Sequence, residues 1–163
     1  MADEVERKFL VPAVPDPVRV GHGVRLRQGY LAIDGAVEVR IRVADDAARL
    51  TVKVGEGLAR TEVEVVLQDQ DVHALWPHTE GRRIEKVRHR QTIAGGLVAE
   101  VDLYDGALAG LCTVEVEFPS RLLADAFTPP SWFGPELTGD RRWSNAALAI
   151  EGRPPLEAGV DTS

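Results

Sequence analysis

The chain has 163 residues and a formal net charge of −7. That length suits one domain with a sizeable core, and the acidic balance argues against nucleic acid or an anionic membrane as the main partner. The single cysteine, Cys112, excludes an intrachain disulfide, and no apolar run approaches the roughly 18 residues of a bilayer span. With no signal peptide at the acidic N-terminus, we expect a cytoplasmic protein.

The first strand is predicted at the N-terminus, where charged residues recur at every second position. Glu4, Glu6 and Lys8 would share one face, because alternate residues of a β-strand point the same way. Two carboxylates beside an amine suit a divalent cation held against a phosphate, since such cations prefer oxygen ligands and an ammonium binds phosphate oxygens. A solvated strand with a ladder of salt bridges explains the same residues equally well.

Seven further segments alternate polar residues with Val, Ile, Leu or Phe, which predicts strands. Turn signals such as Asp34-Gly35 and Gly95-Gly96 separate neighbours and indicate a largely antiparallel meander. About eight strands is the number that closes a small barrel. In chain order, the polar residues of the seven segments are Arg25 and Arg27; Glu38, Arg40 and Arg42; Thr51 and Lys53; Glu62 and Glu64; Lys86 and Arg88; Glu100 and Asp102; Glu115 and Glu117.

The charged positions leave two architectures open. They are the solvated outside of an ordinary barrel or sandwich, or they line the wet interior of an inverted barrel whose apolar outer faces helices cover. Long charged side chains are costly to bury unless they are paired or bound to ions. Three stretches with helical signals would supply the cover and favour the inverted barrel: 71–76, 121–127 and 141–150.

We therefore expect a mainly β protein of the α+β class. Its core would be an eight-stranded antiparallel closed barrel with a charged lumen and a few covering helices, over residues 1–150. Residues 151–163, which include Pro154-Pro155 and few apolar side chains, are expected to form a disordered tail.

The motifs resemble those of the CYTH proteins, also called triphosphate tunnel metalloenzymes, over roughly residues 1–150. Glu4-x-Glu6-x-Lys8 resembles the N-terminal E-x-E-x-K signature, which is weak by itself. Further segments resemble the rest of the family pattern in order and at sensible spacing, which makes the resemblance specific. These segments are 26–31 (R-Q-G-Y), 39–42 (paired Arg), 51–53 (T-x-K), 85–88 (E-K-x-R), 100–102 and 114–117 (acidic strands), and 140–145 (D-x-R-[YW]-x-N).

The resemblance implies a charged antiparallel tunnel in which a triphosphate is hydrolysed or cyclised with Mg²⁺ or Mn²⁺. Small bacterial members of this type resemble inorganic triphosphatases, so we expect hydrolysis of inorganic triphosphate to pyrophosphate and phosphate. The alternatives are a class IV-like adenylate cyclase, a thiamine or nucleoside triphosphatase, and a non-catalytic polyphosphate-binding module. The expected partner is a small-molecule triphosphate rather than nucleic acid or membrane, and the protein would be a monomer or a homodimer.

Phosphoryl transfer needs charge neutralisation, a bridging metal and an in-line water, and the polar positions would divide these tasks. Lys8 is expected to contact the scissile phosphate, Lys86 to act in catalysis, and Tyr30 to position or deprotonate water. Any single residue could instead form a structural salt bridge. The expected substrate-binding residues are Lys8, Arg27, Arg40, Arg42, Lys53, Lys86, Arg88 and Arg142. The expected metal ligands are Glu4, Glu6, Glu100, Asp102, Glu115 and Glu117, supported by Glu62 and Glu64.

Overall fold

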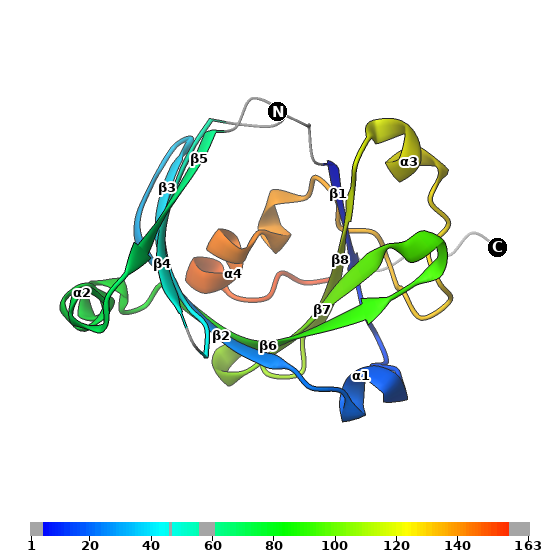
Figure 1. Ribbon diagram of the computed structural model, residues 1–163, viewed down its shortest axis with the longest axis horizontal. Coiled ribbons are helices and arrows are strands. Elements are labelled where there is room, and N and C mark those ends of the chain that lie inside the picture. Colours follow the sequence, from blue (N-terminus) through cyan, green and yellow to red (C-terminus); the bar gives the residue numbers. More distant parts are fainter. Residues whose placement is uncertain (1–4, 46, 56–60, 157–163) are drawn as a thin grey trace.

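The computed structural model describes residues 5–45, 47–55 and 61–156, and its main feature is one antiparallel sheet that curls around a central space (Figure 1). The eight strands predicted from the alternation are confirmed. Their order across the sheet is β1-β8-β7-β6-β2-β3-β4-β5. The strands are β1 (Val5–Leu10), β2 (Val24–Asp34), β3 (Val37–Val43), β4 (Ala48–Val54), β5 (Thr61–Leu67), β6 (Arg83–Thr92), β7 (Val98–Tyr104) and β8 (Cys112–Phe118).

Closure of the barrel is not confirmed, because β1 pairs with β8 and β5 pairs with β4, and no ladder joins β1 to β5 within the described ranges. A later segment of the chain occupies the other edge of β1. The Leu10 amide donates to the Pro135 carbonyl at 2.9 Å, and the Leu137 amide donates to the Lys8 carbonyl at 2.8 Å. Since this segment satisfies the backbone groups of β1, β5 has no free edge there to pair with.

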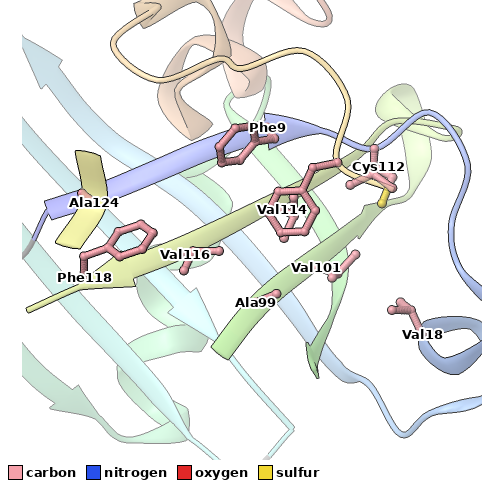
Figure 2. Packing of buried hydrophobic residues seen from close by; sticks show 11 residues of the cluster. Phe9, Val18, Ala99, Val101, Cys112, Val114, Val116, Phe118 and Ala124 are labelled. Atoms are coloured by element: carbon pink, nitrogen blue, oxygen red, sulfur yellow. The ribbon is translucent and has the colours of Figure 1, made fainter. Parts of the chain in front are cut away.

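The convex side of β1, β7 and β8 carries an apolar core (Figure 2). Val101, Val114 and Val116 are completely buried, and Phe9 packs against Phe133 with ring centroids 5.1 Å apart. The short helices α1 (Asp16–Val20) and α3 (Arg121–Ala126) contribute Val18 and Ala124 to this core and lie outside the curled sheet. The inverted arrangement, with apolar side chains outside and charged ones inside, is therefore present on these strands.

Local sequence signals account for where the outer helices begin. Ser120 caps α3, its hydroxyl accepting a hydrogen bond from the Leu123 amide at 3.3 Å. Pro17 lies in the first turn of α1, where the missing N–H has no cost. The predicted helix 71–76 corresponds to α2 (Asp69–Leu75), followed by the 3₁₀ turn η1 (Trp76–Thr79).

The expectation that 141–150 covers an outer face is wrong. The 3₁₀ turn η4 (Arg141–Trp143) and helix α4 (Asn145–Glu151) lie on the concave side, inside the curled sheet (Figure 1). The reason is that the strands carry apolar side chains at one end of this face. Leu10 and Ile84 form a second core there with Trp143 and Leu148, so α4 closes that end of the interior.

The remaining boundary prediction concerns the C-terminal tail. Residues 152–156 continue from α4 without helix or strand, and 157–163 lie outside the described residues, so the extent of the domain stays a prediction. Across the described ranges, none of the helices has the length and apolar content needed to cross a membrane.

Candidate functional site

A cavity of about 1110 Å³ occupies the concave side of the sheet, between its strands and the segment 137–146. Charged residues dominate its wall because the polar positions of β1, β3, β4, β5, β6, β7 and β8 face inward. Most of the sequence-predicted site residues meet here. They are Glu6, Lys8, Tyr30, Arg40, Arg42, Lys53, Glu62, Glu64, Arg88, Glu100, Glu115 and Glu117.

One part of the wall is cationic and comes from β3 and β4. Arg40 is only 8% exposed, and its Nε has no hydrogen-bond partner among the described residues. Lys53 Nζ lies 3.1 Å from Glu62 Oε2, and Arg42 lies 3.6 Å from Glu64 at the nearest atoms. Burial and the adjacent charge of Arg40 lower the pKa of Arg42 from its ordinary value. The lowered pKa shows that Glu64 does not fully offset the burial of Arg42 and the repulsion from Arg40, and a bound anion would add counter-charge here.

The opposite edge of the sheet contributes an acidic cluster from β1 and β8. Glu6 is paired across the strands with Glu117, and Lys8 is paired with Glu115. Lys8 Nζ lies 3.0 Å from Glu115 Oε1. Enclosure by the walls and the charge of Glu115 together raise the pKa of Glu6 to about 7, although the side chain remains open to water in the cavity.

This crowding of carboxylates fits a divalent cation, since all the donors are oxygens and a cation would relieve their mutual repulsion. Glu6, Glu115 and Glu117 are the residues that would hold it. Over the described ranges, no three Asp, Glu, His or Cys side chains already lie close enough together to form a metal site. Binding would therefore require these side chains to turn toward one another. Glu4, also expected as a ligand, lies outside the described residues.

Beneath the wall is a buried ion-pair network. Asp102 receives two hydrogen bonds from Arg88, Nε to Oδ1 at 2.7 Å and Nη2 to Oδ2 at 2.8 Å, and a third from Lys86 Nζ at 2.6 Å. Arg88 also contacts Glu100 and, at 3.3 Å, Glu115. Burial by itself would raise the pKa of Asp102, but the charges of Lys86 and Arg88 lower it to about 2.

The structure places two of the expected site residues in this network rather than on the cavity wall. Lys86 is 1% exposed and Asp102 is fully buried, and neither lines the cavity. Their charges are paired with each other and with Arg88. Their expected roles toward a substrate or a metal ion stay predictions. The pair fixes Arg88, whose guanidinium does line the cavity and holds Glu100 and Glu115 in place.

Arg27 also departs from its expected position. In the β2–β6 register it lies opposite Glu85 on the convex face, and its guanidinium is 5.1 Å from the Trp76 ring centroid. The strand turns the opposite parity inward, so Gln28 and Tyr30 line the cavity instead. The sequence pattern of β2 was misleading, because on the other strands most charged residues face inward, whereas the charged residues of β2 face outward.

The roles expected for Arg142 and Tyr30 are altered as well. Arg142 donates to Asp140 through Nε at 3.0 Å and Nη2 at 2.7 Å, and it does not line the cavity. Tyr30 does line the cavity, but burial raises the pKa of its phenol above 10. A phenol of this kind is a poor acceptor of a proton from water at neutral pH, although it can still position one.

Several residues of the cavity wall were not predicted. Glu38 and Arg90 have the same parity as the predicted residues of β3 and β6, so the alternation contained their signal. Asn145 ends the D-x-R-[YW]-x-N segment noted in the sequence, but its place in the wall depends on α4 lying inside the sheet. Its Oδ1 accepts hydrogen bonds from the Tyr104 hydroxyl at 2.9 Å and from Lys86 Nζ at 3.5 Å. It therefore connects α4 to the buried network.

Comparison with known sequences places this cavity among related proteins. No protein-family model matches the chain. An inorganic triphosphatase of Nitrosomonas europaea is 45% identical over 148 residues, which cover 90% of this chain and 97% of the relative. An inorganic triphosphatase of Acetivibrio thermocellus is 35% identical over 151 residues, which cover 91% and 94% of the two chains.

Solved structures give the same result. The crystal structure of an inorganic triphosphatase matches with a TM-score of 0.74 at 42% identity, covering 94% of this chain and 99% of the other. A protein from Hippeastrum, described as an adenylyl cyclase with a dominant triphosphatase activity, matches with a TM-score of 0.54 at 15% identity, over 76% and 83% of the two chains. The second match supports the fold alone. Because the identity to its curated relatives extends over nearly the whole of each chain, the protein belongs to the inorganic triphosphatases of the CYTH type.

Proposed function

We propose that the cavity binds inorganic triphosphate and hydrolyses it to pyrophosphate and phosphate with the help of a divalent cation. The observation that carries the proposal is that one cavity contains both an under-neutralised cationic wall and a crowded carboxylate cluster. Phosphoryl transfer needs both kinds of group, since the chemistry consists mainly of positioning and charge stabilisation. The relatives that match over nearly their whole length are inorganic triphosphatases.

The cationic residues bind and orient the substrate. The buried Nε of Arg40 has no hydrogen-bond partner in the part of the chain that the structure describes, and Arg42 and Lys53 extend the row along the same face. Guanidinium groups bind phosphate oxygens through paired hydrogen bonds, which fixes the orientation of the chain as well as its charge. Lys8 approaches from β1 at the acidic side, where it can contact a phosphoryl group that lies between the two halves of the wall.

The acidic residues complete the site. A divalent cation such as Mg²⁺ or Mn²⁺, when bound, supplies neutralisation of charge on the phosphoryl oxygens and lowers the pKa of water. Glu6, Glu115 and Glu117 would hold it from β1 and β8, and Glu100 is kept in place by its pair with Arg88. Glu62 and Glu64 hold Lys53 and Arg42 in place when no substrate is bound.

The direct test is phosphate release from tripolyphosphate, with ATP and thiamine triphosphate in parallel, in Mg²⁺, Mn²⁺ or EDTA. We expect metal-dependent release that is fastest with tripolyphosphate, and loss of that release in Glu117→Gln. The matched control is Glu85→Gln, which removes the same charge from the convex face and should retain turnover. Formation of a cyclic nucleotide from ATP, or wild-type turnover in Glu117→Gln, would overturn the proposal.

A further inference from the structure

A second compartment continues from the triphosphate cavity on the concave side of the sheet. Its volume is about 530 Å³, and Arg42, Arg88 and Arg90 line both spaces. Arg49 lines the second compartment as well, together with apolar side chains from β2 and from the residues between β3 and β4. Among the described residues that line it there is no carboxylate, whereas the first cavity has several on its wall.

The positive charge of this compartment is concentrated between β3 and β4. Arg42 and Arg49 are directly opposite each other in the register of these strands. Both turn to one carboxylate, Glu64, which lies 3.6 Å from Arg42 and 4.0 Å from Arg49. Like charges at opposed positions of a sheet destabilise it, so two guanidinium groups that share one distant carboxylate favour a further anion.

The two remaining arginines form the other side. Arg88 is held by Asp102, Glu100 and Glu115, and Arg90 lies 2.7 Å from Glu100 with its side chain 74% exposed. The side chains of Arg49 and Arg90, which are 44% and 74% exposed, extend to solvent, and Arg90 also lines the triphosphate cavity together with Arg42 and Arg88. A linear anion bound along Arg42 would reach this compartment at one end.

We propose that this compartment is a phosphate subsite. It binds the fourth phosphate group of a linear polyphosphate whose first three phosphate groups occupy the triphosphate cavity. The inference rests on the proposed function, because it places the triphosphate in the adjoining cavity. Two of the neighbouring carboxylates, Glu64 and Glu100, are each shared by two of these arginines. Guanidinium groups that share a carboxylate in this way suit a phosphate bound directly through hydrogen bonds. A free orthophosphate has the same chemistry, and the experiment distinguishes the two sources.

The test compares Arg49→Gln with Arg25→Gln. Both variants remove a partly exposed arginine that lies within 4.0 Å of one carboxylate. Arg49 is 44% exposed and lies near Glu64, whereas Arg25 is 58% exposed and lies near Asp105 on the convex side. Binding of tripolyphosphate, tetrapolyphosphate and orthophosphate is measured by calorimetry in EDTA, so that nothing is hydrolysed. Turnover of both polyphosphates is then measured with Mg²⁺. Arg49→Lys tests whether a positive charge suffices.

We expect the wild type to bind tetrapolyphosphate more tightly than tripolyphosphate. Arg49→Gln should bind tetrapolyphosphate about tenfold more weakly, with the affinity for tripolyphosphate little changed, so that the preference is lost. Arg25→Gln should behave as the wild type. Equal weakening of both polyphosphates in Arg49→Gln would overturn the subsite, as would weakening of orthophosphate binding alone. If tetrapolyphosphate binding depends on Arg49 but tripolyphosphate is not hydrolysed, the subsite stands and the proposed function is overturned. If tripolyphosphate is hydrolysed but tetrapolyphosphate is not bound more tightly, the proposed function stands and the subsite is overturned.

Discussion

Lys86 Nζ lies 2.6 Å from Asp102 Oδ2, and the two side chains are 1% and 0% exposed. Arg88 closes the network from the side of the cavity. The pair lies beneath the cavity wall and does not line the cavity, so we expect its loss to act first on stability and only through Arg88 on catalysis. Removing one member of a buried ion pair leaves the other charge without compensation, which is strongly unfavourable.

We expect Lys86→Met to lower the free energy of unfolding by about 3 kcal/mol, because Asp102 would keep only Arg88 as its counter-charge. Urea denaturation followed by tryptophan fluorescence measures this. The control is Arg25→Gln, whose exposed partner Asp105 is 3.8 Å away, and it should cost less than about 1 kcal/mol. Equal stability of the two variants would show that the buried pair has no structural role.

The stability of the protein should depend on the charge of Asp102 in acid. Its pKa is about 2 in the folded protein and 3.8 ordinarily, so ionised Asp102 stabilises the fold above about pH 4. This contribution is lost as the pH falls through 2. Relative to Asp102→Asn, the wild type should lose on the order of 2 kcal/mol of unfolding free energy between about pH 4 and pH 2. Parallel acid-denaturation curves for the two proteins would refute the assignment.

The opposite dependence is expected for Glu6 in the metal-free protein. Its folded pKa of about 7 is above the ordinary 4.5, so any stabilising effect is complete below pH 4.5 and is lost as the pH rises through 7. At alkaline pH, Glu6→Gln should therefore raise the Tm in EDTA. Mg²⁺ should raise the wild-type Tm, but that of Glu6→Gln much less, because the substitution removes one proposed ligand.

The control for this thermal experiment is Glu85→Gln, which changes a carboxylate on the convex face. Its Tm should respond to Mg²⁺ as the wild type does. If Mg²⁺ stabilises wild type, Glu6→Gln and Glu85→Gln by the same amount, the acidic cluster is not where the cation binds.

Substrate affinity should depend on Arg40 and not on Arg27. Arg40→Gln removes a buried donor that has no partner among the described residues, so we expect KM for tripolyphosphate to rise by at least about tenfold. Arg27 is on the convex face against Trp76, and Arg27→Gln should leave KM unchanged. Steady-state kinetics of the two variants decide the question, and a raised KM in Arg27→Gln would reverse the orientation assigned to β2.

Much of the fold could be predicted because alternation specifies which residues share a face. Glu38, Arg40 and Arg42 on β3, and Glu115 and Glu117 on β8, show the period of two without interruption, and they meet in one cavity. The N-cap of α3 was predictable for a local reason, since the Ser120 hydroxyl satisfies an amide only three residues away.

What could not be predicted depends on contacts between distant segments. The alternation on β2 gives two possible inner faces, and only the pairing with β3 and β6 turns Gln28 inward and Arg27 outward. The burial of Lys86 likewise depends on Asn145 and α4, which lie far along the chain. In the described part of the chain the sheet does not close between β1 and β5, because the segment near Leu137 already forms backbone hydrogen bonds with the outer edge of β1.

The position of β1 beside β8 has a consequence for the way the chain acquires its structure. During synthesis β1 emerges before the other seven strands of the described sheet, but its hydrogen-bonding partner β8 is the last of them to be made. The side chains of Glu6 and Lys8 on β1 must therefore stay in water until β8 has formed. Because pairing of such distant segments is slow, we expect refolding to be limited by the docking of β1, and the cavity to gain its acidic half last.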